Sequence, residues 1–286
     1  MTILKFEDKE RELLDNCPWC GSKEFEKWGE PLRGFFSVKC KSCSIIFVKN
    51  RLNQKGLNKF FKNYLSEQHQ FEDEKKTQRN TMYLLEFKAL QQFIKPSRVL
   101  DVGCSGGYFL DIFKANGFDC YGIELGEEAA KIASMKHPIW MGELPHFDTN
   151  KMFDLIIFRG VLHMAPNPKQ YIDKAISLLN TGGLLFISSS PNGASICSNL
   201  FKENWSLHFP EESLLHLTSA HLDPYMNEKG LSKILEYSYY METPYAKPEE
   251  DILMIAKAIE LKRSGKNIDF KSPAFWGNML TLIYKN

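Results

Sequence analysis

The feature that most constrains this chain is an apolar run that leads into a glycine-rich turn and then into a helical pattern. The run is Val99-Leu100-Asp101-Val102, the turn spans Gly103 to Gly107, and the helix is expected to reach about Asn116. Glycine suits such a turn because a Cβ would block either the tight turn or close approach of the backbone to a ligand. The pattern therefore predicts a ligand crevice at the carboxyl edge of a sheet.

Strand and helix patterns alternate after this turn. Further strands are expected at 120–123, 153–158 and 184–188, with a helix at 127–135. A last strand at 279–284 is expected beside another at 235–239, with a helix at 248–263 between them. This alternation predicts an α/β fold, Rossmann-like and doubly wound around a mostly parallel sheet with helices on both faces.

Two acidic residues end neighbouring strands over the predicted crevice. Asp101 would repel bound phosphates, and Ser105 stands where the dinucleotide fingerprint G-x-G-x-x-G requires glycine. Asp101 instead suits a cationic amino-acid or sulfonium ligand, and Glu124 is placed to bind the hydroxyls of a ribose. The alternative is that both acids are solvated strand-end charges beside a plain turn.

The segments V-L-D-V-G-C-S-G-G and Y-G-I-E resemble the first two motifs of class I S-adenosylmethionine (SAM) dependent methyltransferases. The resemblance implies a seven-stranded sheet with an antiparallel last strand. SAM is the implied cofactor, with its methionine part at the glycine turn, its ribose at Glu124 and its adenine near 141–144. The implied cofactor-binding residues are Asp101, Gly103, Cys104, Ser105, Gly106, Gly107, Tyr108, Glu124, Leu125, Gly142, Glu143, Leu144, Arg159 and Val161.

Four cysteines near the N-terminus form two C-x-x-C pairs, Cys17 with Cys20 and Cys40 with Cys43. This spacing is typical of a small zinc ribbon. Four protein ligands leave no open position on the ion, so we expect Zn²⁺ to be structural and to supply the folding energy of a segment too short for its own core. A redox-active pair or four unrelated thiols are the alternatives.

Three parts of the chain follow from these patterns: an N-terminal segment with the ribbon (1–51), a helical connector or lid (52–95) and a SAM-binding domain (96–286). The connector is expected to hold two amphipathic helices, the second stopped by Pro96. Its aromatic side chains, together with Trp205, are candidates for a substrate pocket. Those connector residues are Tyr64, Phe71 and Tyr83.

A general base near neutral pH would help an oxygen or carbon acceptor, and histidine is the usual choice. His163, after the fourth strand, and His208 are the candidates, although either could be an ordinary core or surface histidine. Related enzymes carry histidine at two positions that are Met164 and Ser213 here. This departure leaves base-assisted carbon methylation of a sugar unsupported.

The combination of ribbon, connector and SAM domain resembles methyltransferases that act on small molecules, such as sugars and surface-polysaccharide or natural-product intermediates. One alternative is an RNA methyltransferase that reads nucleic acid with the ribbon, since 15–55 holds eight basic and four acidic residues. The net charge of +1 gives this alternative little support. Another alternative is a catalytically degenerate SAM-binding protein. The acceptor atom stays open between oxygen, nitrogen and carbon, as does the oligomeric state.

The expected compartment is the cytoplasm. The first ten residues are charged and lack the apolar segment of a secretion signal, and no stretch approaches the roughly 20 apolar residues of a membrane span. Seven cysteines with only four in paired motifs argue against a secreted disulfide framework.

Overall fold

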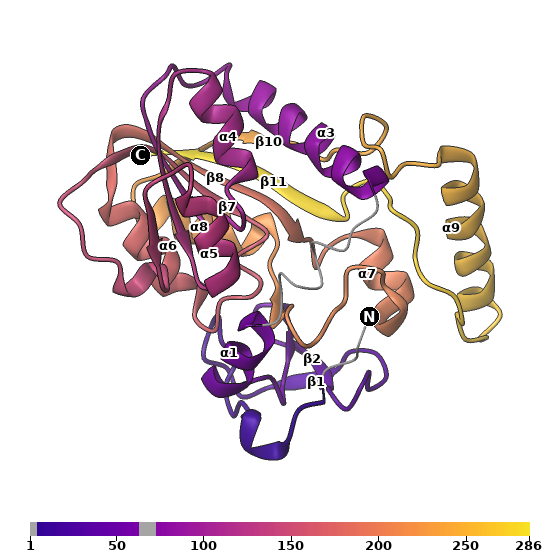
Figure 1. Cartoon of the computed structure of the whole chain (residues 1–286). Helices are drawn as coiled ribbons and strands as arrows, with labels where there is room; N and C mark the ends of the chain where they lie inside the picture. Colours follow the sequence, from indigo (N-terminus) through magenta and orange to yellow (C-terminus); the bar gives the residue numbers. More distant parts are fainter. Residues whose placement is uncertain (1–4, 63–72) are drawn as a thin grey trace.

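The computed structural model describes residues 5–62 and 73–286, which form two β-sheets with helices around the larger one (Figure 1). The larger sheet has seven strands in the order β10-β11-β8-β7-β4-β5-β6. Its strands are β4 (Arg98–Val102), β5 (Asp119–Glu124), β6 (Ile139–Met141), β7 (Phe153–Arg159), β8 (Leu179–Pro191), β10 (Ser232–Glu236) and β11 (Met279–Lys285).

The strands from β6 to β8 pair in parallel, and β11 pairs antiparallel with both β8 and β10. The predicted fold class is therefore confirmed, including the antiparallel last strand. The chain runs outward in one direction from β4 through β5 to β6 and in the other from β7 to β8. Where such a reversal occurs, a crevice opens at the carboxyl ends of the strands.

Helices cover both faces of this sheet (Figure 1). The helices are α1 (Gln54–Lys62), α3 (Asp73–Leu90), α4 (Tyr108–Ala115), α5 (Glu127–Ser134), α6 (Pro168–Ser177), α7 (Ile196–Phe201), α8 (Ser219–Glu228) and α9 (Pro248–Arg263). Those that cover the larger sheet are α3, α4, α5, α6 and α8, whereas α1 lies beside the smaller sheet and α9 packs against α7 (Figure 1). Three short 3₁₀ helices are η1 (Asp8–Glu10), η2 (Leu144–His146) and η3 (Lys202–Asn204).

Alternating side chains of the central strands divide the core into two clusters. In β7, Leu155 and Ile157 join a cluster with α3 and α4, whereas Ile156 and Phe158 join one with α6 and α8. This alternation follows from the two-residue period of a strand. Both faces are apolar, so the sheet is held rigidly between helices and its edge can position polar groups accurately.

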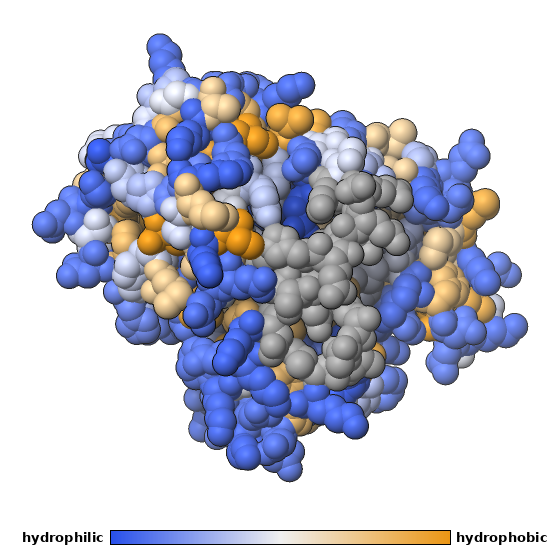
Figure 2. All heavy atoms as spheres, viewed as in Figure 1, coloured by the Kyte–Doolittle hydropathy of each residue, from blue (hydrophilic) through white to orange (hydrophobic). Residues whose placement is uncertain are grey.

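The smaller sheet joins the N-terminal segment to the rest of the chain. Its order is β1-β2-β3-β9, formed by β1 (Phe25–Lys27), β2 (Ser37–Cys40), β3 (Ile46–Val48) and β9 (Leu215–His216). Phe47 of β3 and Leu215 of β9 are fully buried in the same cluster as the helices α6 and α8. The N-terminal sheet thus shares the core of the larger domain, while its outer surface is mostly hydrophilic (Figure 2).

Several element boundaries differ from the expectation. α3 ends at Leu90 rather than at Pro96, because the chain closes a turn in which the amide of Phe93 donates to the Leu90 carbonyl. The strand expected at 235–239 is β10, which ends at Glu236. Tyr240 is buried and donates its hydroxyl to Asp251 of α9 at 2.9 Å, so the chain leaves the sheet early.

Within the described residues, no helix is both long enough and apolar enough to span a membrane.

Candidate cofactor and acceptor site

The predicted glycine turn lies between β4 and α4. The amides of Gly103 and Cys104 both donate to the Ile123 carbonyl of β5, at 2.8 and 3.0 Å. Gly103 has a φ of +72°, and a Cβ built there would lie 2.6 Å from Cγ2 of Val161. The turn is therefore held against the loop that follows β7, and glycine is required at this position.

Gly103→Ala is expected to lower the free energy of unfolding by about 1–3 kcal/mol, because it combines positive-φ strain with the contact to Val161. Urea unfolding of both proteins measures this. Gly265→Ala is the matched control, since Gly265 has a φ of +67° but nothing within 4 Å of its Cβ position. An equal loss in both variants would contradict a role for the close packing at Gly103.

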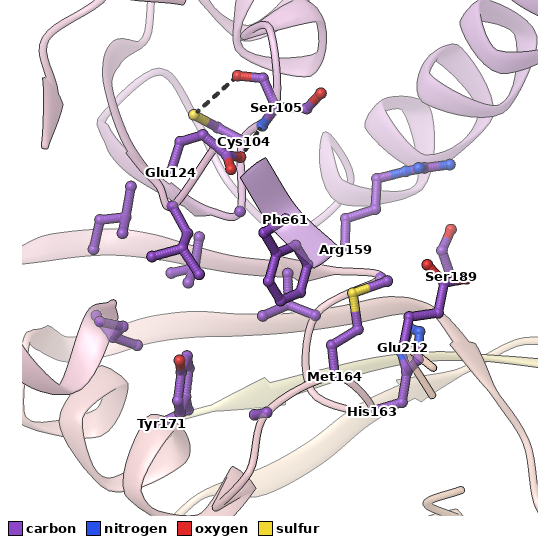
Figure 3. A pocket seen from close by; sticks show the side chains of 18 of the residues that line it. Phe61, Cys104, Ser105, Glu124, Arg159, His163, Met164, Tyr171, Ser189 and Glu212 are labelled. Atoms are coloured by element: carbon purple, nitrogen blue, oxygen red, sulfur yellow. Dashed lines mark hydrogen bonds between the residues drawn. The ribbon is translucent and has the colours of Figure 1, made fainter. Parts of the chain in front are cut away.

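A cavity of about 340 Å³ lies at the carboxyl ends of β4, β5 and β7 (Figure 3). This size is in the range of small-molecule sites. Most of the predicted cofactor-binding residues line it: Asp101, Gly103, Cys104, Ser105, Glu124, Leu125, Gly142, Glu143, Leu144, Arg159 and Val161. Three others, Gly106, Gly107 and Tyr108, belong to the turn and the first residue of α4 but are not part of the lining.

Glu124 is fixed at the end of β5 by backbone amides. Its Oε2 accepts from the amide of Ser105 and its Oε1 from the amide of Gly126, both at 2.7 Å. Burial nevertheless raises the pKa of Glu124 above its ordinary value. The carboxylate is thereby oriented over the cavity beside the glycine turn (Figure 3).

Asp101 is a buried carboxyl group with a missing partner. Its side chain is 3% exposed, and its Oδ1 has no hydrogen-bond partner among the described residues. Burial raises the pKa of Asp101 to about 8, and Arg159 opposes this increase. A cationic ligand group would supply the missing partner and favour the ionised form. The residues present thus fit the charged amino-acid end of SAM.

Glu143 forms hydrogen bonds with residues of two helices beside the cavity, α6 and α1. Its Oε2 accepts from the Tyr171 hydroxyl of α6 at 2.9 Å, and its Oε1 accepts from Gln54 Nε2 of α1 at 2.8 Å. Phe61, also from α1, lines the same cavity (Figure 3). Gln54 and Tyr171 were not predicted, because these contacts span long sequence separations and no local motif marks them.

The far side of the cavity carries Glu212, a third residue that was not predicted. The amide of Leu214 donates to the carbonyl of His163 at 2.8 Å, which brings Glu212 and Ser213 beside His163 and Met164. Burial and the neighbouring Glu211 raise the pKa of Glu212 to about 7.

The two histidines named as candidate bases are both buried. His163 lines the cavity, whereas His208 is outside it. Nδ1 of His208 lies 3.0 Å from Nε2 of His216. Burial lowers the pKa of His163 to about 3 and that of His208 to about 3. Such groups are neutral and weakly basic at pH 7, so their role as bases stays a prediction and Glu212 is the better-placed group.

The aromatic candidates for a substrate pocket have different surroundings. Tyr83 lines the cavity, and the guanidinium of Arg159 lies 4.6 Å from the centre of its ring. Trp205 is fully buried in a separate cluster and does not line this cavity. Tyr64 and Phe71 lie outside the described residues.

The four N-terminal cysteines converge. Sγ of Cys17 lies 3.7 Å from Sγ of Cys43, Sγ of Cys20 lies 3.6 Å from Sγ of Cys40, and all four sulfur atoms lie within 4.8 Å of one another. A tetrahedral zinc ion with Zn–S bonds of about 2.3 Å separates its sulfur ligands by about 3.8 Å. The cluster therefore fits zinc.

Comparison with known proteins gives relatives that match part of this chain. A protein of Methanocaldococcus jannaschii is 34% identical over 110 residues, covering 37% of this chain and 51% of that protein. A ubiquinone biosynthesis O-methyltransferase of Pectobacterium carotovorum is 20% identical over 184 residues, covering 52% of this chain and 77% of that protein. The chain thus spans only about half the length of the archaeal relative.

Solved structures share the fold at low sequence identity. Magnesium protoporphyrin IX methyltransferase from Synechocystis matches with a TM-score of 0.56 and 13% identity, covering 82% of this chain and 100% of that one. A 1,6-didemethyltoxoflavin-N1-methyltransferase from Burkholderia thailandensis matches with a TM-score of 0.55 and 14% identity, covering 87% and 95%. The family model described as a methyltransferase domain matches residues 68–236, more than half of the chain. The chain therefore belongs to the methyltransferase domain family and has the fold of the class I SAM-dependent methyltransferases.

Proposed function

We propose that the chain catalyses SAM-dependent methyl transfer to a small-molecule acceptor, such as a sugar or a surface-polysaccharide or natural-product intermediate. The observation that carries this proposal is the buried carboxyl of Asp101, whose Oδ1 has no hydrogen-bond partner among the described residues and which lines one cavity together with the glycine turn and Glu124. Family membership and a fold shared with methyltransferases support it.

The residues of the cavity have distinct roles in this proposal. Asp101 pairs with the ammonium group of the cofactor, Glu124 accepts from its ribose hydroxyls, and residues 142–144 lie against its adenine. The bound cofactor supplies an electrophilic methyl group on a sulfonium. The protein then has to orient the acceptor and exclude water, which accounts for the position of Phe61 and the rest of α1 beside the cavity.

Glu212 is the proposed general base of the transfer. Its carboxyl group lines the cavity on the side away from the glycine turn, and a pKa of about 7 matches proton removal near neutral pH. Neither an ion pair nor a hydrogen bond to another described residue occupies its carboxylate. It is therefore available to a proton on the acceptor.

A structural zinc ion on Cys17, Cys20, Cys40 and Cys43 completes the proposal. The four thiolates would close the coordination shell, so the ion takes no part in methyl transfer. The cluster supports the fold around the cavity instead. Nε2 of His221 in α8 lies 2.8 Å from the carbonyl oxygen of Cys43, so this contact joins the cluster to a helix of the larger domain.

The test of cofactor binding is calorimetric titration with S-adenosylhomocysteine (SAH). Glu124→Gln is expected to weaken SAH binding by about 1–3 kcal/mol, because it removes charge-assisted hydrogen bonds. Asp119→Asn is the control, since Asp119 is exposed at the opposite end of the same strand and pairs with Arg98 at 2.9 Å. An affinity unchanged by Glu124→Gln would refute the ribose assignment, and no SAH binding to the parent protein would refute the proposed function.

A further inference from the structure

A second cavity, of about 500 Å³, adjoins the first. It is built from α3, the 239–245 segment after β10, the 272–278 segment and the start of β11. The residues that line both cavities are Arg79, Arg159, Ser189, Leu207 and Met279. A molecule in the second cavity would thus meet the first at this shared wall.

Apolar and aromatic side chains dominate the second cavity. Tyr239, Tyr240 and Phe275 line it, with Met82 and Leu207. The rings of Tyr240 and Phe275 lie 5.3 Å apart, and the bond from the Tyr240 hydroxyl to Asp251 fixes one of them in place. Rigid rings and thioethers provide a surface suited to a flat, apolar ligand.

Many polar groups of the second cavity are already bonded to the protein. Ser206 Oγ lies 3.0 Å from Ser272 Oγ, and Thr243 Oγ1 donates to the carbonyl of Tyr240 at 2.7 Å. A sugar needs hydrogen-bond partners for most of its hydroxyl groups, and these side chains are occupied. The lining therefore favours an aromatic ring over a sugar.

Glu86, which also lines this cavity, is occupied as well. One of its oxygens accepts from Arg159 Nε at 2.6 Å and the other from Ser189 Oγ at 3.3 Å. The charges of Glu86 and Arg159 are thus paired with each other, and the wall they form presents no isolated charge to a ligand.

Asn278 is an exception. Its side chain is 5% exposed, and its Nδ2 donates to the carbonyl of Pro273 at 3.1 Å. Its Oδ1 is buried and has no partner among the described residues, although Asn278 lines the cavity. A buried acceptor without a partner is costly, so a ligand hydroxyl that donates to it would be favoured.

We propose that the second cavity is the acceptor chamber and that the acceptor is an aromatic compound with two ring hydroxyls, of the catechol class. One hydroxyl donates to Asn278, and another lies at the wall shared with the first cavity. In the transfer, the methyl carbon bonds to this phenol oxygen as its bond to sulfur breaks, the electron pair stays on sulfur, and the phenol proton passes to Glu212. This inference rests on the proposed function and names its substrate class.

The experiment fills the chamber without touching the cofactor cavity. Ala274 lines only the second cavity and is an exposed residue, so Ala274→Trp can project an indole into the chamber, and Ala274→Ser is the matched control. Calorimetry of the SAH-bound proteins uses 2,3-dihydroxynaphthalene as the probe and glucose as a polyol of similar size. Mass spectrometry of the naphthalene after incubation with SAM provides a second readout.

The parent protein and Ala274→Ser are expected to bind 2,3-dihydroxynaphthalene but not glucose. Ala274→Trp should weaken this binding by about tenfold or more and leave the SAH affinity unchanged. Three results would each overturn the chamber assignment. They are an equal affinity of Ala274→Trp for 2,3-dihydroxynaphthalene, preferential binding of glucose, and no binding of 2,3-dihydroxynaphthalene to a protein that binds SAH. Failure to bind SAH would instead refute the proposed function.

Discussion

Glu212→Gln is expected to lower kcat/KM for methyl transfer by about 10²–10⁴-fold in mildly alkaline buffer. The amide keeps the size of the side chain but cannot accept the proton of the acceptor. SAH affinity should be unchanged, because Glu212 lies across the cavity from the glycine turn that the proposal assigns to the cofactor. Steady-state kinetics with an accepted substrate, together with SAH calorimetry, measures both effects.

The pH dependence of kcat/KM distinguishes a Glu212 that acts as a general base from one that only packs against its neighbours. Burial raises the pKa of Glu212 to about 7, so the carboxyl is protonated below that value and kcat/KM should rise as pH increases through it. Glu212→Gln should lose this rising limb. Glu211→Gln is the control, because removing the neighbouring charge should shift the limb to lower pH without abolishing it. A Glu212→Gln enzyme that keeps the limb would exclude Glu212 as the base.

Removal of zinc is expected to have the largest effect on stability. Structural zinc sites contribute about 10–16 kcal/mol of apparent binding free energy to folding. Because Phe47 and Leu215 share one core, loss of the ion should loosen the 208–216 segment as well as the ribbon. Cys17→Ser should therefore abolish stoichiometric zinc, lower the unfolding midpoint in urea and weaken methyl transfer.

Elemental analysis and urea titration measure these changes. Cys120→Ser is the control, since Cys120 is a buried cysteine of the larger domain that donates to the Leu110 carbonyl and lies outside the cluster. It should retain one zinc ion per chain. Zinc-free protein with an unchanged unfolding midpoint would show that the cysteines do not hold the fold together.

Elements with strong local signals were predictable from the sequence. α9 has the predicted bounds, Pro248–Arg263. Proline is favoured in the first turn of a helix, three acidic residues follow it, and Lys262 and Arg263 stand in the last turn, where they complement the helix dipole. The glycine turn was found for the same reason, because its chemistry lies within a few consecutive residues.

Features created by distant contacts could not be predicted. β9 has only two residues, and it is a strand because Leu215 and His216 pair with Phe47 and Ile46. The same applies to Glu212, which reaches the cavity through the bond between the Leu214 amide and the His163 carbonyl. Its raised pKa arises from burial, which no local pattern encodes.

His208 shows why residue type alone was a poor guide to the base. It was a candidate because histidine titrates near neutral pH, yet it lies between Trp28 and His216 in an apolar cluster. Burial there favours the neutral imidazole. The candidate site therefore combines acids and glycines that the sequence marks with a carboxyl group that only the fold brings into place.

Native mass spectrometry of the purified chain, with and without added SAM, is the direct test of cofactor binding by this protein. We expect one zinc ion per chain in both samples and an additional SAM or SAH adduct after SAM is added. A chain that holds zinc but takes up neither SAM nor SAH would contradict a methyltransferase function.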